Sequence, residues 1–273
     1  MVVLVTGAAR GMGRSMSLGL AREGIEVVLV DNLSDELAKT ADDVAQLGGR
    51  RPLTSAMDVT DEVAVAAVID KTMERFGRIN ALVNNAGIGQ ATIRRDQVQR
   101  PIDFWEITPE QWRHMLNVNI NGFFLMTRAA VRAMLPSRSG RIIAVTTSLD
   151  TMIRRGSAPY GGSKAAIEAT MATLADDLAD TGLTANVLVP GGMVDTVMIP
   201  TESGLDRSKM IRPDIMVPPL LWLLSNDAAK ISGHRILARL WDANLPPDQA
   251  FKASSAPTAW PQLGVQSVAP PMP

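Results

Sequence analysis

Short apolar segments alternate with longer segments of helical spacing along most of the chain, and this alternation limits the possible folds more than any other feature of the sequence. Runs rich in Val, Ile and Leu are typical of strands buried on both faces, as in a parallel sheet covered by helices. Right-handed crossovers between such strands predict a doubly wound α/β fold in a single domain. The expected strands are residues 2–5, 25–30, 79–83, 142–146 and 184–189, and the expected helices end near 22, cover about 61–76, begin after Thr108, and cover about 159–180.

The last part of the chain differs from the rest. Residues 241–273 are rich in Pro and Ala, whereas residues 1–240 carry the alternating pattern. Because proline interrupts helices and central strands, we expect an extension over 241–273 without regular helix or central strand, either an extended arm or partly disordered. The main domain is therefore expected to cover residues 1–240.

Composition excludes several classes of protein. Lys and Arg number 27 against 28 Asp and Glu, so a net charge of -1 argues against a nucleic-acid or anionic-membrane partner. The chain has no cysteine, and its two histidines, His114 and His234, form no ligand motif, so we expect no metal site. No apolar run approaches the roughly 18 residues of a membrane span, and no basic leader precedes the first one. We therefore expect a cytoplasmic protein.

A glycine-rich turn is the first chemical signal. Gly7, Gly11 and Gly13 follow the first strand and open a helix, where glycine lets the backbone approach a pyrophosphate at the helix N-terminus. The second strand ends in Asp31, eighteen residues after Gly13, where a carboxylate can accept hydrogen bonds from the ribose of an adenosine. An ordinary tight turn and a helix-capping aspartate are the alternatives, but the order of strand, turn and helix favours a dinucleotide site.

Asp31 also bears on the choice between NAD and NADP. A 2′-phosphate about 4 Å from its carboxylate would cost roughly 1 kcal/mol in water and about 4 kcal/mol at an effective dielectric constant near 20. Arg10 has the opposite effect, because its guanidinium could pair with that phosphate. We expect the repulsion from Asp31 to be the larger effect, so NAD is the expected cofactor and NADP the less favoured one.

Tyr160 and Lys164 form the second chemical signal. Four residues apart on an expected helix, they share one face. A phenol with a pKa near 10 must lose about 3 units to act as a base at neutral pH, and a neighbouring ammonium and a cationic nicotinamide both favour the phenolate. A surface pair is the alternative, but the upstream strand ends in hydroxyl residues at the sheet edge where ligands bind.

Together these motifs resemble the short-chain dehydrogenase/reductase family from Val2 to about Ala238. The resemblance implies a Rossmann fold and an NAD(P)-dependent oxidoreductase. The matching motifs, in the family's order, are the turn Thr6 to Gly13, Asp31, Asp58-Val59, Asn84 to Gly87, Asn119, Tyr160 with Lys164, and Pro190-Gly191.

The resemblance assigns catalytic roles. Tyr160 would be the general acid and base, and Lys164 would lower its pKa and bind the nicotinamide ribose. Ser148 would hydrogen-bond the substrate oxygen, with Thr147 as the alternative because many relatives have thirteen residues between the hydroxyl and the tyrosine. Asn119 would hold a water of a proton relay.

The resemblance also implies the cofactor contacts, with Asn84 partly bracing the strands. They are Gly7, Arg10, Gly11, Met12, Gly13, Asp31, Asp58, Val59, Asn85, Ala86, Gly87, Tyr160, Lys164, Pro190, Gly191, Met193 and Thr196.

The substrate is less constrained. Arg94, Arg95 and Arg100 could bind a carboxylate or phosphate, but a solvated loop balanced by Asp96 and Asp103 is favoured. A lid is expected over about 193–215, with methionines that either line the substrate pocket or pack against the core.

Three functions stay open. The favoured one is NAD-dependent interconversion of a small-molecule secondary alcohol and ketone. The alternatives are an NADPH-dependent 3-oxoacyl thioester (acyl carrier protein) reductase and a dinucleotide-binding sensor or scaffold without catalysis. The family resemblance further implies a homodimer or homotetramer through the helices that begin near 108 and 160.

Overall fold

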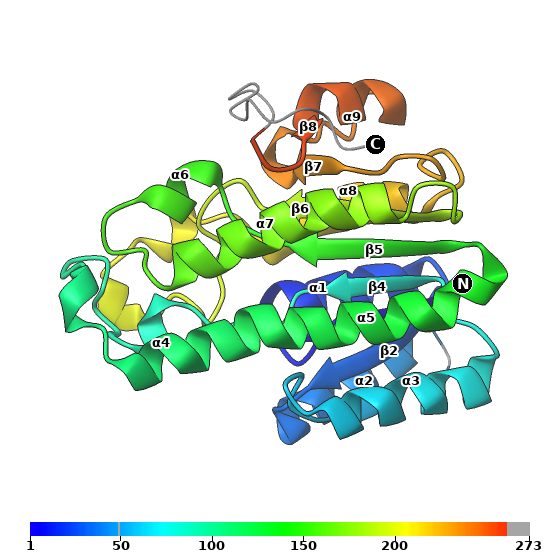
Figure 1. Ribbon diagram of the computed structural model, residues 1–273, viewed down its shortest axis with the longest axis horizontal. Helices are drawn as coiled ribbons and strands as arrows, with labels where there is room; N and C mark the ends of the chain where they lie inside the picture. The colour runs from blue at the N-terminus through cyan, green and yellow to red at the C-terminus, as the bar shows by residue number, and fades with distance from the viewer. Residues whose placement is uncertain (49, 261–273) are drawn as a thin grey trace, which may run out of the picture.

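A computed structural model describes residues 1–48 and 50–260, and its centre is one twisted sheet covered by helices on both faces (Figure 1). The strand order is β3-β2-β1-β4-β5-β6-β7-β8; the first seven strands in sequence are parallel, and β8 is antiparallel to β7. The predicted doubly wound α/β fold is therefore confirmed. The strands are β1 (Val2–Thr6), β2 (Glu26–Asp31), β3 (Leu53–Ala56), β4 (Ala81–Asn84), β5 (Gly140–Val145), β6 (Leu183–Val189), β7 (His234–Leu237) and β8 (Ser255–Pro257).

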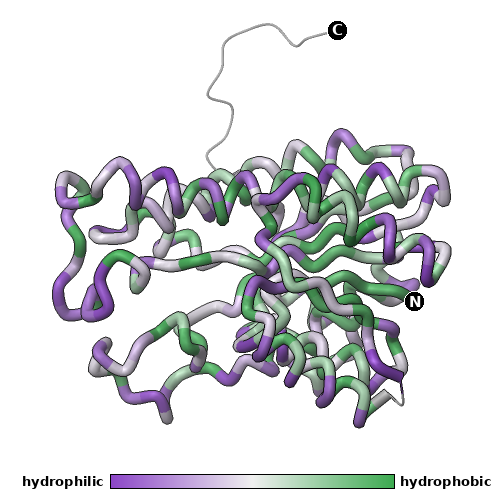
Figure 2. The backbone as a smooth tube through the Cα atoms, turned by 90° about the horizontal axis from the view of Figure 1, so that it is seen from below, coloured by the Kyte–Doolittle hydropathy of each residue, from purple (hydrophilic) through white to green (hydrophobic). Residues whose placement is uncertain are grey.

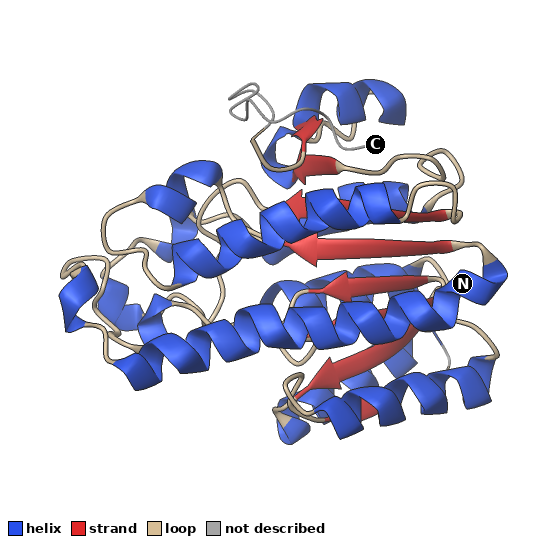
Figure 3. Cartoon of the chain, viewed as in Figure 1, coloured by secondary structure: helices blue, strands red, loops and turns tan. Residues whose placement is uncertain are grey.

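Two apolar layers hold the helices to the sheet. One layer contains side chains from α1, α2 and α8, and the other contains side chains from α3, α5 and α7, which lie in front of the sheet in Figure 3. Strand residues are buried on both sides, as expected for a parallel sheet between helices. The helices are α1 (Gly11–Arg22), α2 (Ser34–Gly48), α3 (Glu62–Phe76), α4 (Pro109–Leu116), α5 (Gly122–Met134), α6 (Leu149–Ile153), α7 (Tyr160–Asp177), α8 (Val217–Leu224) and α9 (Pro247–Ser254).

Local capping chemistry explains several helix ends. The Asp61 carboxylate accepts hydrogen bonds from the first free N–H groups of α3, and Gly77 ends the same helix in the left-handed conformation. Thr108 and Gln111 form a capping box at the start of α4, with Pro109 at its first position. These three helix boundaries follow from residues within one turn of each end.

The C-terminal segment corrects one expectation. Instead of lacking regular helix, it forms α9 and then β8, which pairs with the edge of the sheet. Helix α9 is possible because Pro246 and Pro247 lie at its N-cap and first position, where no helical N–H bond is lost. Pro257 lies in an edge strand, the position that tolerates proline in a sheet. The part of this expectation that concerns residues 261–273 lies outside the described residues.

The longest connections leave the carboxyl ends of the strands. Residues 85–108 follow β4 and residues 190–216 follow β6, and both extend beyond the same end of the sheet, opposite the label N in Figure 1. Figure 2 shows that the strands form the most hydrophobic part of the chain, whereas these extended connections are mixed in hydropathy. Within the described ranges, no helix combines the length and hydropathy that a membrane span requires.

Candidate active site

A cavity of about 460 Å³ lies at the carboxyl ends of β1, β2 and β4, where the strand order changes direction. The glycine-rich turn forms its floor. Gly7 and Gly11 have φ angles of 65° and 57°, which only glycine adopts readily. A Cβ on Gly7 would lie 2.7 Å from the Asn85 amide nitrogen, and one on Gly13 would lie 2.0 Å from the Gly7 carbonyl oxygen. Gly13 thus lets α1 approach the turn, although it is not part of the cavity wall.

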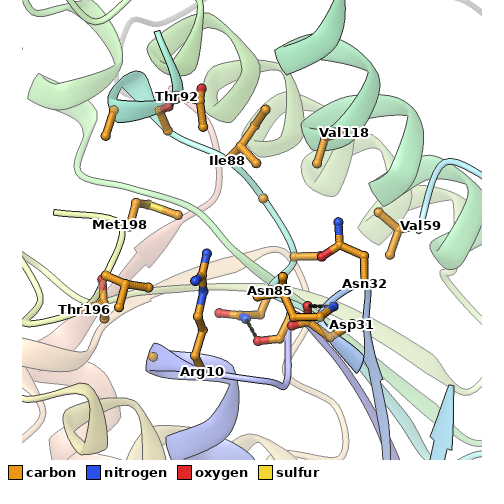
Figure 4. Close-up of a pocket in the computed structure, with 18 of the residues that line it drawn as sticks. Arg10, Asp31, Asn32, Val59, Asn85, Ile88, Thr92, Val118, Thr196 and Met198 are labelled. Atoms are coloured by element: carbon orange, nitrogen blue, oxygen red, sulfur yellow. Dashed lines mark hydrogen bonds between the residues drawn. The ribbon is translucent and has the colours of Figure 1, made fainter. Parts of the chain in front are cut away.

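Asp31 lies at the end of β2 and on the cavity wall. Its carboxylate accepts hydrogen bonds from the backbone N–H groups of Ala9, at 2.9 Å, and Leu33, at 3.1 Å. Each oxygen accepts only one of these bonds, so lone pairs remain for a ligand hydroxyl. Figure 4 shows Arg10 rising from the turn into the same cavity, and within the described chain its guanidinium forms no ion pair.

The two asparagines at the end of β4, Asn84 within the strand and Asn85 after it, have structural hydrogen bonds. The Asn85 side chain donates to the carbonyls of Thr6, at 2.9 Å, and Gly7, at 3.1 Å, while the Thr6 hydroxyl accepts from the N–H groups of Asn85 and Ala86. Asn84 donates to the hydroxyl of Thr127 on α5. Both side chains therefore fix the strand ends around the cavity.

The predicted cofactor residues divide into those that line this cavity and those outside its wall, which are Gly13, Tyr160, Lys164, Pro190, Gly191 and Met193. Eleven of them line this cavity: Gly7, Arg10, Gly11, Met12, Asp31, Asp58, Val59, Asn85, Ala86, Gly87 and Thr196. The other wall residues are not among the predicted cofactor contacts, although Arg95 and the lid residues were predicted near the substrate: Asn32, Leu33, Met57, Ile88, Gly89, Ala91, Thr92, Arg95, His114, Val118, Val197, Met198 and Pro200. Several of them directly follow a strand end, as Asn32 follows Asp31, and this position was the available signal.

Tyr160 and Lys164 lie on one face of α7, next to the end of β5. The Lys164 ammonium is 5.9 Å from the centre of the Tyr160 ring and donates to the Val145 carbonyl at 2.9 Å. Burial lowers the pKa of the Lys164 ammonium to about 8. Burial raises the pKa of the Tyr160 phenol, and a side-chain hydrogen bond with Thr147 opposes that rise. Burial alone therefore works against a phenolate, and the neighbouring groups work for it.

The two candidate hydroxyls occupy different positions. Thr147 lies near the Tyr160 phenol, because its side chain lowers the pKa of that phenol. Ser148 is the residue before α6, and its side chain makes no capping hydrogen bond with that helix. Of the two, Thr147, the alternative in the sequence analysis, is the one whose side chain affects the pKa of Tyr160.

Asn119 lies in a π-helical turn, Asn117–Asn121, between α4 and α5. Its buried amide accepts from the Ile88 N–H at 2.9 Å and donates to the Ile88 carbonyl at 3.0 Å and the Ser163 hydroxyl at 2.9 Å. A Cβ on Gly87 would lie 3.1 Å from the Asn119 oxygen and 3.5 Å from the Lys164 ammonium. The π turn, a feature often found at functional sites, thereby connects the loop after β4 to α7.

The segment after β6 faces the glycine-rich turn. A Cβ on Gly11 would lie 3.2 Å from a methyl carbon of Thr196, so the lid residue sits directly over the turn. Pro190, Gly191 and Met193 do not belong to the cavity wall, and the Met193 side chain is exposed.

The arginines of the loop after β4 are all paired. Arg94 pairs with Glu106, Arg95 with Glu202, and Arg100 with Asp96. The loop after β4 is therefore better described as solvated and charge-balanced than as an anion-binding site. Asp103, expected to balance these charges, pairs instead with Arg155.

One of these pairs connects the loop to the lid. The guanidinium of Arg95 binds the Glu202 carboxylate through two hydrogen bonds, at 2.7 and 3.0 Å, and the Gln99 amide donates to the Ser203 carbonyl. This pairing lowers the pKa of Glu202 to about 2. We call these two contacts the latch, because they join two segments that both contribute to the cavity wall.

Comparison with known proteins identifies the family. The sequence profile of the short chain dehydrogenase family matches residues 1–204, so the chain belongs to this family of oxidoreductases. Over 241 residues it is 31% identical to the hydroxy(phenyl)methylsuccinyl-CoA dehydrogenase subunit BbsD of Thauera aromatica, covering 85% of this chain and 92% of that protein. Over 244 residues it is 30% identical to the 3-oxoacyl-acyl-carrier-protein reductase FabG of Escherichia coli, covering 86% and 94%.

Solved structures give the same result. A short chain dehydrogenase of Shigella flexneri complexed with NADP has a TM-score of 0.78 at 26% identity and covers 87% of this chain and 96% of its own. A 3-ketoacyl-acyl-carrier-protein reductase of Brucella melitensis complexed with NADH has a TM-score of 0.75 at 26% identity, covering 86% and 95%. Oxidoreductases that bind NAD or NADP thus share this Rossmann fold.

Proposed function

We propose that the protein interconverts an uncharged secondary alcohol and a ketone by hydride transfer with NAD. The observation that carries this proposal is the arrangement of Tyr160, Lys164 and Thr147 at the end of β5, beside a cavity with Asp31 on its wall. The glycine-rich turn, the Asp31 carboxylate and the cavity together support this proposal, because a dinucleotide site needs such a turn, such a hydrogen-bonding group and such a space.

The chain's residues would hold NAD in three places. The backbone of the glycine-rich turn and the N-terminus of α1 would bind the pyrophosphate, Asp31 the adenosine ribose, and Lys164 the nicotinamide ribose. Pro190, Gly191 and Met193, with Thr196 over the turn, would contact the nicotinamide half. When bound, NAD supplies the hydride acceptor for the alcohol carbon.

Tyr160 would transfer the proton. During oxidation its phenolate oxygen removes the hydroxyl proton of the alcohol, and during reduction its phenol returns a proton to the ketone oxygen. The Lys164 ammonium and the Thr147 hydroxyl both stabilise the phenolate against the effect of burial. We assign the contact with the substrate oxygen to Thr147, with Ser148 as the neighbouring candidate. We assign to Asn119 the binding of a water that would relay protons between Lys164 and solvent.

The wall of the cavity supports an uncharged substrate. Ile88, Val118, Val197, Met198 and Pro200 contribute apolar surface. The arginines that could have bound a carboxylate are neutralised by acids of the same region. An apolar wall with few charges binds apolar ligands best.

A second function has one observation in its favour. Arg10 points into the cavity without an acidic partner among the described residues, and it could bind the 2′-phosphate of NADPH, as an acyl thioester reductase would require. The similarity to FabG agrees with this alternative. Asp31 opposes it, because its carboxylate would repel the same phosphate.

The test measures reduced-nicotinamide formation from a panel of secondary alcohols with NAD and with NADP, and NADPH oxidation with a 3-oxoacyl thioester. The Tyr160→Phe variant is the matched control, because it removes one oxygen and leaves the ring in place. We expect activity with NAD that is lost in the variant, while NAD binding measured by calorimetry is nearly unchanged. NAD binding without turnover of any substrate would favour the sensor, and turnover by the variant would refute Tyr160 as the base.

The assembly is a separate prediction. Phe104, Trp105, Trp112 and Phe124, on or next to α4 and α5, are exposed, which supports a homodimer or homotetramer through the helix that begins near 108; the prediction also places α7 in the contact. Light scattering after size-exclusion chromatography measures the mass directly, and a mass of 29.3 kDa would contradict the prediction.

A further inference from the structure

A buried ion pair lies behind the proposed catalytic residues. The Arg235 guanidinium, on β7, donates to the Glu168 carboxylate, on α7, at 2.8 Å, and both side chains are almost completely inaccessible to solvent. Removing two charges from water costs several kcal/mol per ion, and an apolar pair of similar volume is often as stable. The pair therefore calls for a role other than stability.

Glu168 continues the row of α7 residues that contains Tyr160 and Lys164. The three residues are spaced by four, so they face the end of β5 on successive turns of the helix. Lys164 binds the Val145 carbonyl at 2.9 Å, and Glu168 accepts from the Thr146 hydroxyl at 2.9 Å. The last residue of β5 and the residue after it are thus held by α7 residues one turn apart.

Arg235 extends this pattern to the residue that faces the phenol. Its second nitrogen donates to the Thr147 carbonyl at 3.2 Å, while Glu168 fixes the orientation of the guanidinium. The Thr147 side chain in turn lies near the Tyr160 phenol and lowers its pKa. The chain of contacts runs from the ion pair, through the Thr147 backbone, to the phenolic oxygen.

The C-terminal segment completes the surroundings of the pair. The backbone N–H of Ala259 points to the Glu168 carboxylate at 3.4 Å, and Ala259 has a φ of 64°, which is unusual for a residue other than glycine. Next to it, the Thr258 N–H donates to the Gly233 carbonyl just before β7. Residues beyond the expected domain end at 240 thereby help to satisfy the buried carboxylate.

We propose that Glu168 and Arg235 are positioning residues that hold Thr147 against Tyr160, so that the reactive phenol depends on a charge pair it does not touch. The proposal rests on the proposed function only for the effect on turnover. Its first consequence concerns the phenol itself and is measurable without any substrate. The charged group that the structure places against the Tyr160 ring is Lys164, and it is unchanged in every variant below.

The experiment uses the full chain labelled with 3-fluorotyrosine. Because Tyr160 is the only tyrosine, one fluorine resonance reports its titration. The variants are Glu168→Met, Arg235→Met, the double variant, and Thr147→Val as the positive control. We expect the pKa of the phenol to rise by about one unit in all four, since each loses or displaces the hydrogen bond from Thr147 that stabilises the phenolate.

The double variant separates positioning from stability. Each single variant leaves one uncompensated buried charge and lowers the melting temperature, whereas the double variant regains most of that loss. We expect its phenol pKa to stay about one unit above that of the wild type. With a substrate found by the panel, kcat should stay about tenfold lower while NAD affinity is unchanged.

A double variant with wild-type melting temperature and wild-type phenol pKa would overturn the proposal and leave the pair a structural one. If the wild type turns over no substrate, the proposed function fails, but the fluorine titration still decides whether the pair positions Thr147. A single variant that does not fold leaves the double variant to give the answer.

Discussion

Replacing Lys164 with methionine should make the protein without cofactor more stable and remove its activity. Burial lowers the pKa of this ammonium from 10.5 to about 8. One pKa unit corresponds to about 1.4 kcal/mol, so the protonated lysine costs the folded state about 3 kcal/mol. The variant also loses the hydrogen bond to the Val145 carbonyl, which contributes about 1 kcal/mol. The expected net gain is about 2 kcal/mol at pH 7.

The pH dependence provides the stricter test. The pKa of Lys164 is lower in the folded state than in the unfolded state. Below about pH 8 both states are protonated, and the folded wild type carries the full cost. Between about 8 and 10.5 the unfolded state binds more protons, so the unfolding free energy of the wild type rises with pH. The advantage of Lys164→Met should therefore shrink across this window and disappear near its upper end.

Urea denaturation of both proteins at several pH values from 7 to about 10 measures this difference. Lys71→Met, on the exposed face of α3, is the matched control for replacing a lysine with an apolar side chain, and it should show no such gain. A Lys164→Met variant that is less stable than the wild type at pH 7 would refute the reasoning. So would a gain that does not change with pH.

Three further predictions concern the turn, the cofactor and the latch. Gly13→Ala should lower the unfolding free energy, measured by urea denaturation, by more than about 3 kcal/mol, because its Cβ would lie 2.0 Å from a backbone carbonyl oxygen. Gly162→Ala is the matched control: the space around its Cβ is open, so the change should be neutral or stabilising by up to about 1 kcal/mol. Asp31→Ala should reduce the preference in kcat/KM for NAD over NADP at least about tenfold, and an unchanged ratio would mean that this carboxylate does not contact the ribose. Glu202→Gln or Arg95→Gln should speed tryptic cleavage of the lid severalfold while changing the unfolding free energy by less than about 1 kcal/mol, since the pair is exposed.

Features set by neighbouring residues could be predicted from the sequence. The capped start of α4 depends on Thr108, Pro109 and Gln111, and the turn after β1 depends on glycines within a few positions. Helix α9 differs from the prediction although its residues are adjacent, because the prolines at its start do not interrupt it. A proline at the N-cap or first position of a helix removes no helical hydrogen bond, whereas a proline farther along would interrupt the helix.

Features set by distant residues could not be predicted. The partner of Arg95 lies 107 residues away, so the sequence gives the charges of the latch but not their pairing. The choice between Thr147 and Ser148 depends on how far the extended backbone of β5 continues before α6 begins. Successive side chains of an extended backbone point in opposite directions, so a difference of one residue decides which hydroxyl faces Tyr160. Tertiary packing alone determines both.

The antiparallel strand β8 has a consequence for how copies of the chain can meet. A parallel sheet ending in β7 would present a row of unpaired N–H and C=O groups, a template onto which a strand of another molecule could add. Here Ser255, Ala256 and Pro257 occupy that row, opposite Ile236, Arg235 and His234. The new outer strand has three residues, and its proline has no N–H to offer. Extension of the sheet from one molecule into the next is therefore blocked on this side, and association is left to side chains on the helices, where it can be selective and limited in number.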